Sequence, residues 1–185
     1  CIIGISLCNV QASFAASSQE DERKAVAKAN NMFASDVYTR LKSSPGNLVF
    51  SPYSLFTALS MTYAGARQNT EVQMAEVLHF PFASPQIHEA LNAWSQALKT
   101  SDEDAQKGYQ LYHANALWTQ EGLPLLAEFT ELLETYYDAT LTTLDFTQAA
   151  QQTADTINAW VNQQTQGKIS ELIDSQNLPQ SLALS

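Results

Sequence analysis

Residues 47–70 read NLVFSPYSLFTALSMTYAGARQNT, and this stretch is the most informative part of the chain. Residues 48–50 form an apolar run that is too short for a helix, so they predict a strand. Ser51 is a favourable N-cap, and Pro52 follows at the first helical position, where its missing N–H costs nothing. Because the residues that follow are apolar almost all the way round until Gly65, the stretch predicts a core helix buried on most sides.

Around this stretch, the pattern of apolar residues predicts further helices and strands. Helical spacing predicts helices over 23–41, 71–78, 85–98 and 124–136, with a last helix that starts at 147 or 148 and ends at 164. The aromatic-rich, nearly alternating segment 109–118 and the threonine-rich segment 139–144 predict strands. The order helix, strand, three helices, strand, helix, strand, helix is an α+β pattern.

Composition is that of a globular protein, with 45% hydrophobic and 15% charged residues in a chain of 185. The chain carries 9 Lys and Arg against 19 Asp and Glu, for a net charge of −10. Nucleic acids and anionic membranes both require clustered positive charge, so neither is expected as a partner. The simplest reading of the charge is a soluble, acidic surface.

The first residues, Cys1 to Cys8, form an apolar run of the length found inside signal peptides. We therefore expect residues 1–15 to be the remnant of a secretory signal peptide and the protein to be secreted, either extracellular or periplasmic. Two pairs fit the cleavage positions: Ser13 with Ala15, or Val10 with Ala12. The alternative is a short apolar tail of the domain. Both cysteines lie in this segment, so disulfide, zinc and thiol chemistry are not expected in the mature protein.

The 47–70 stretch closely resembles the second helix of the serpins, a family of suicide-substrate protease inhibitors. Three more segments resemble the family: Ala114–Gln120, Phe129 with its following helix, and Ile157–Ile169. The resemblance runs from about Asn30 to the last residue. It implies a serpin-like α+β fold with helices A to F, strands 1 and 2 of sheet A and one strand of sheet B. Residues 16–185 would then be the N-terminal portion of one serpin domain, which stops before strand 3 of sheet A.

Serpins trap serine or cysteine endopeptidases: a loop is cut, an acyl-enzyme forms, and the loop inserts into sheet A. By resemblance, Ser51, Pro52 and Ser54 match the shutter beneath that sheet. The residues that match the helix F region over the sheet are Asn158, Trp160, Thr165, Gly167 and Lys168. Considered without the resemblance, Ser51 is an N-cap and Ser54 a first-turn serine, and both roles are compatible with the shutter.

The reactive centre loop of a serpin would lie beyond Ser185, so no reactive centre residue is expected in this chain. We therefore expect that the fragment does not inhibit alone, that a target protease binds only the full-length protein, and that exposed apolar faces let the fragment self-associate. The sequence up to Ser185 leaves two alternatives open. The protein could be a non-inhibitory serpin-like binding or carrier protein, or a truncated remnant without function.

An enzyme is not expected, because His79, His88 and His113 lie on different elements without ligand-spaced neighbours. The motifs of serine hydrolases, P-loop proteins and zinc proteases are not in the sequence. We accordingly predict no catalytic residue, no metal and no cofactor. Residues 85–108 carry two lysines against four acidic residues, so heparin binding is not expected either.

Overall fold

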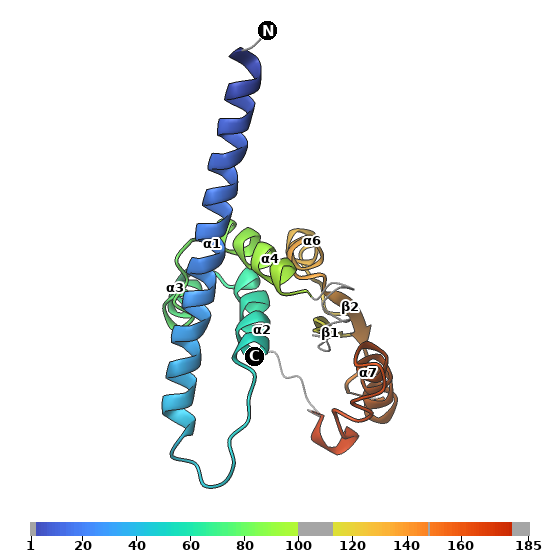
Figure 1. The fold of residues 1–185 in the computed structure, drawn as a ribbon. Helices are drawn as coiled ribbons and strands as arrows, with labels where there is room; N and C mark the ends of the chain where they lie inside the picture. The colour runs from blue at the N-terminus through green and yellow to red at the C-terminus, as the bar shows by residue number, and fades with distance from the viewer. Residues whose placement is uncertain (1–2, 100–112, 148, 179–185) are drawn as a thin grey trace. The chain divides into compact units, whose positions relative to one another are not determined.

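The computed structural model describes residues 3–99, 113–147 and 149–178, and it describes side chains from Ser18 onward. The chain forms two compact units, residues 1–98 and 99–185. The first unit holds four helices (Figure 1), namely α1 (Ile3–Leu41), α2 (Pro52–Gly65), α3 (Gln68–Val77) and α4 (Gln86–Leu98). Within this unit, α1 contacts both α2 and α4, and α2 also contacts α3.

The core of the first unit is built on aromatic residues from several elements. Phe56 of α2 is fully buried. Its ring centroid lies 5.8 Å from that of Phe33 on α1, 5.6 Å from that of Phe80 after α3, and 6.4 Å from that of Trp94 on α4. Aromatic pairs at such separations stabilise a core beyond the area they bury. Phe56 therefore joins three helices and the loop that follows α3.

The predicted N-terminus of α2 is confirmed, since Pro52 is its first residue and the Ser51 side chain caps it. The predicted strand over 48–50 is wrong, because residues 47–50 form no ladder and Val49 is 93% exposed. A strand requires a hydrogen-bonded neighbour, and within the described residues none pairs with this segment. Burial on most sides is also not observed, because Leu55 and Leu59 of α2 remain 41% and 37% exposed.

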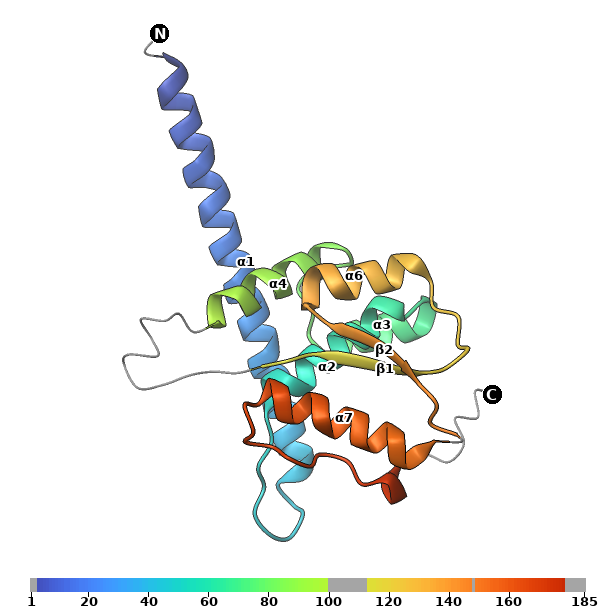
Figure 2. The ribbon, with the colours of Figure 1, turned by 90° about the vertical axis from the view of Figure 1, so that its right-hand side faces the viewer.

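The second unit contains a strand–helix–strand crossover (Figure 2). Strand β1 (Ala116–Gln120) and strand β2 (Thr140–Leu144) pair in parallel, and α6 (Ala127–Tyr137) connects them. Parallel strands need such a crossover because the chain must return to the same end of the sheet. Of the predicted strand over 109–118, residues 116–118 belong to β1 and residues 113–115 do not, and residues 109–112 lie outside the described part of the chain. Residues 100–108, which belong to the 85–108 segment considered for heparin binding, also lie outside the described part.

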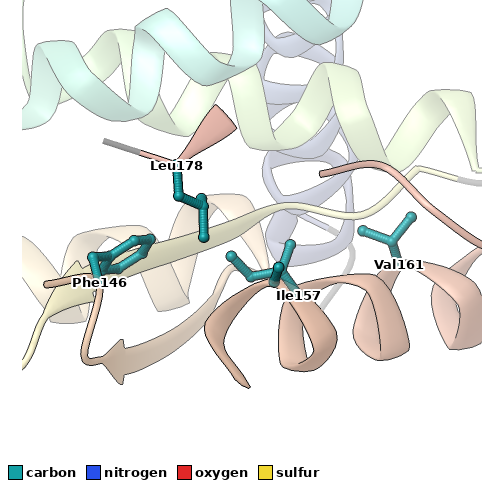
Figure 3. Packing of buried hydrophobic residues seen from close by; sticks show 5 residues of the cluster. Phe146, Ile157, Val161 and Leu178 are labelled. Atoms are coloured by element: carbon teal, nitrogen blue, oxygen red, sulfur yellow. The ribbon is translucent and has the colours of Figure 1, made fainter. Parts of the chain in front are cut away.

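The core of the second unit lies against α7 (Ala150–Gln164), which is followed by the short 3-10 helix η1 (Ser175–Asn177). One cluster of buried residues there comprises Phe146, Ala154, Ile157, Val161 and Leu178, and four of them are labelled in Figure 3. Ala154, Ile157 and Val161 recur at helical spacing and so form one buried face of α7. The α+β order predicted from the sequence is thus confirmed in its helices and in the strands β1 and β2.

In the part of the chain that the structure describes, no helix combines the length and apolarity needed to cross a membrane.

Candidate conformational site

Asn158, on α7, binds the segment that returns past this helix after residue 168. Its Oδ1 accepts hydrogen bonds from the backbone N–H groups of Leu172 at 2.8 Å and Ile173 at 3.0 Å. Its Nδ2 donates to the carbonyl oxygen of Ile173 at 2.8 Å. An amide side chain is suited to this role because it offers both an acceptor and a donor. One side chain thereby fixes the returning backbone against the helix.

The turn between α7 and this returning segment is held by its own backbone and by Thr165. The N–H of Gly167 donates to the carbonyl of Asn162 at 2.8 Å, and that of Lys168 donates to the carbonyl of Thr165 at 3.1 Å. The Thr165 hydroxyl oxygen accepts from the N–H of Ile169 at 3.0 Å. Gln166 and Gly167 have φ of 52° and 79°, so two consecutive left-handed residues reverse the chain.

Trp160 joins α7 to strand β1. Its ring lies edge-to-face with that of Trp118, with centroids 5.2 Å apart and an interplanar angle of 88°. Both rings are partly buried and pack against the core of the second unit. The contact packs α7 against strand β1 of the parallel pair.

The structure brings the predicted residues together as two separate groups. Asn158, Trp160, Thr165, Gly167 and Lys168 all lie on α7 or in the turn after it. In the first unit, the Ser51 hydroxyl oxygen accepts from the backbone N–H of Ser54 at 3.2 Å and from the Ser54 hydroxyl at 2.9 Å. Pro52 lies between these two serines at the start of α2. The capping role of Ser51 is confirmed, and the shutter and helix F roles stay predictions.

Sequence reasoning missed the partners of Asn158, which follow it by 14 and 15 residues. No helical or strand periodicity connects positions at that separation. The one available signal was the Ile157–Ile169 motif itself, which indicated that this turn is specific without indicating what Asn158 binds.

The three histidines lie in different environments. His79 has a carboxylate partner that its sequence neighbours did not reveal, because its Nε2 lies 2.7 Å from Oδ2 of Asp36 on α1. His88 on α4 is fully buried, and this burial lowers its pKa to about 4. Burial, and secondarily Lys99, lowers the pKa of His113. Among the described residues, no group of three metal-binding side chains occurs.

Residues 28–185 match the family model described as "Serpin (serine protease inhibitor)". The chain therefore belongs to the serpin family. It is 35% identical over 152 residues to an uncharacterized serpin-like protein of Methanosarcina mazei, a match that covers 80% of this chain and 35% of that protein. It is 36% identical over 152 residues to a leukocyte elastase inhibitor of Bos taurus, covering 81% of this chain and 39% of that protein.

Solved structures agree with this assignment. Ovalbumin from emu matches with a TM-score of 0.72 and 30% sequence identity, covering 84% of this chain and 43% of the ovalbumin chain. A reaction-loop-cleaved lamprey angiotensinogen matches with a TM-score of 0.75 at 22% identity, which supports the fold alone. The chain thus has part of the serpin fold. It spans 35% and 39% of the length of the two curated relatives above.

Proposed function

We propose that the complete protein carrying this chain is a serpin-type inhibitor of serine or cysteine endopeptidases that acts by suicide-substrate conformational trapping. The observation that supports this proposal is the match of residues 28–185 to the serpin family model, within a family that includes protease inhibitors. The target protease is the expected partner. The described residues supply a framework in this proposal, whereas the bond that the protease cuts lies in the remainder of the protein.

The contacts of α7 suggest how this framework takes part. A loop that inserts into a sheet requires the elements packed on that sheet to move and then return. Three hydrogen bonds from Asn158 and the Trp160–Trp118 contact hold α7 in place. Such contacts are individually weak, about 0.5–1.5 kcal/mol each, so they can break and re-form during one inhibitory event.

A gel assay with a panel of proteases tests the proposal. The complete protein and the 185-residue chain are each incubated with an elastase, a trypsin, a chymotrypsin and papain. The complete protein is expected to form a complex that survives boiling in SDS with at least one protease, and the 185-residue chain with none. If the complete protein is only cleaved by every protease and its melting temperature does not rise after cleavage, the inhibitory proposal is wrong. A binding or carrier role then becomes the better explanation.

Export is a second part of the proposal and needs its own test. The apolar run Cys1–Cys8 supports a signal peptide that is removed after Ala15 or Ala12. The protein is expected in the medium or periplasm of its producing cell, with an N-terminus shortened to one of these sites. Recovery of intact protein from the cytosolic fraction alone would overturn this part and leave the inhibitory part untouched.

A further inference from the structure

The first unit contains a hollow of about 750 Å³, lined by residues of α1, α2 and α3 and by the loop that follows α3. This volume lies in the range of small-molecule sites in proteins. Tyr63, Phe80 and Phe82 give the hollow an aromatic wall, Met32 and Val72 add aliphatic surface, and Glu71 and Glu76 supply carboxylates. None of these residues belongs to the groups described above for α7 or for the start of α2.

The aromatic wall packs against the core of the first unit. The Tyr63 side chain is buried, and its ring lies edge-to-face with that of Phe80 at a centroid distance of 4.9 Å. Phe80 in turn contacts the fully buried ring of Phe56. In front of this wall, Val72 and Met32 remain 56% and 43% exposed. The hollow therefore combines a fixed apolar back wall with an open side that faces solvent.

The carboxylates that line the hollow are those of Glu71 and Glu76. In the described part of the chain, no lysine or arginine lies within ion-pair distance of Glu71 or Glu76. Arg67, one turn before Glu71, instead donates to the carbonyl oxygens of Ala64 at 2.9 Å and Ala66 at 2.8 Å. Glu71 lies close enough to the aromatic wall to act on it electrostatically. Burial raises the pKa of Tyr63, and the negative charge of Glu71 raises it further. His79, the remaining titratable residue of the lining, is paired with Asp36.

We propose that this hollow binds a small organic cation, an amine with an aromatic or aliphatic body. The body would pack against Tyr63, Phe80 and Phe82, and the ammonium group would lie on the α3 side of the hollow, beside Glu71 or Glu76. The choice of a cation follows from charge complementarity, since two solvent-facing carboxylates attract a cation and repel an anion. The aromatic faces favour the same ligand, because a cation is attracted to the negative face of a ring.

Three probes of the same shape test the proposal by isothermal titration calorimetry: 2-naphthylmethylammonium, neutral 2-naphthalenemethanol and the anion 2-naphthoate. The ammonium probe is expected to bind about tenfold more tightly than the alcohol, and the naphthoate most weakly. Glu71→Gln and Glu76→Gln are each expected to weaken ammonium binding about threefold, in line with exposed ion pairs. Neither variant is expected to change the affinity for the alcohol.

The matched control is Glu131→Gln, which removes an exposed carboxylate on α6 in the second unit. It makes the net charge less negative by the same one unit and is expected to leave all three affinities unchanged. Far-UV circular dichroism of each sample confirms that the protein titrated is folded. Equal affinity of folded protein for the three probes, lack of measurable binding up to millimolar concentration, or an equal loss with Glu131→Gln would each overturn the proposal. No protease enters this experiment, so its outcome is independent of the inhibitory function.

Discussion

The partly buried side chain of Asn158 makes three hydrogen bonds to residues 172–173. Removing this side chain therefore tests how strongly these residues are attached to α7. Asn158→Ala leaves two backbone N–H groups and one carbonyl without these partners. The free energy of unfolding is expected to fall by about 1–3 kcal/mol, measured by urea denaturation. Amide hydrogen exchange at Leu172 and Ile173 is expected to accelerate more than exchange in the middle of α7.

Gln163→Ala provides the comparison, because Gln163 is an exposed residue of the same helix. Its effect on unfolding is expected to stay within about 0.5 kcal/mol, with exchange at Leu172 and Ile173 unchanged. Equal acceleration in both variants would show that the returning segment is held by the backbone rather than by Asn158.

Gly167 has φ of 79°, a conformation that is costly for a residue with a Cβ atom. An added Cβ would meet no atom within 4 Å, so the cost of Gly167→Ala is one of backbone conformation alone. We expect a loss of about 1–2 kcal/mol in unfolding free energy. Because asparagine tolerates the left-handed region, Gly167→Asn is expected to recover part of that loss in the same urea experiment. If both variants were as stable as the wild type, the left-handed turn would not be required.

At the level of elements, α4 carries a buried histidine that makes the first unit sensitive to acid. The pKa of His88 is lowered to about 4 by burial, against an ordinary value of 6.5. Between these values the unfolded chain binds a proton that the folded chain does not, so stability is full above pH 6.5 and falls as the pH drops toward 4. The loss approaches about 3 kcal/mol at the lower limit.

Urea unfolding measured from pH 7.5 to pH 4 tests this prediction when the wild type is compared with His88→Phe. The variant keeps a ring beside Tyr63, whose centroid lies 5.8 Å from that of His88, and removes the titrating group. The difference between the two proteins is expected to change with pH over the window from 6.5 to 4. His113 has the same direction of pKa shift and contributes equally to both proteins, so it cancels in the difference. A difference independent of pH would mean that the pKa of His88 is the same in the folded and the unfolded protein.

The helices were predictable because each carries a local signal. Ser51 and Pro52 marked the start of α2, and the spacing of Ala154, Ile157 and Val161 marked the buried face of α7. The strand prediction for residues 48–50 was not met, because an apolar run favours a strand without showing whether another strand pairs with it. The bonds of Asn158 and the pairing of His79 with Asp36 were not predictable, since they join residues that only the folded backbone brings together.

At the scale of the molecule, the chain is part of a longer fold, and α2 shows what that means for its surface. Leu55, Ala58 and Leu59 recur at helical spacing on a face of α2 that the described residues leave exposed. Apolar side chains in a contiguous stripe favour association when nothing covers them. The 185-residue chain is therefore expected to self-associate in a concentration-dependent way.

Sedimentation velocity measured over a range of concentrations tests this expectation with two charged variants. Leu59→Glu places a carboxylate in the centre of the exposed stripe, so the monomer fraction of the 185-residue chain is expected to rise. Val77→Glu changes a 61% exposed residue of α3, away from the stripe, and is expected to leave the monomer fraction unchanged. If both variants shift the distribution equally, the added negative charge rather than the α2 face controls association. A wild-type chain that remains monomeric at every concentration would contradict the prediction, because the stripe would then be too small to drive association.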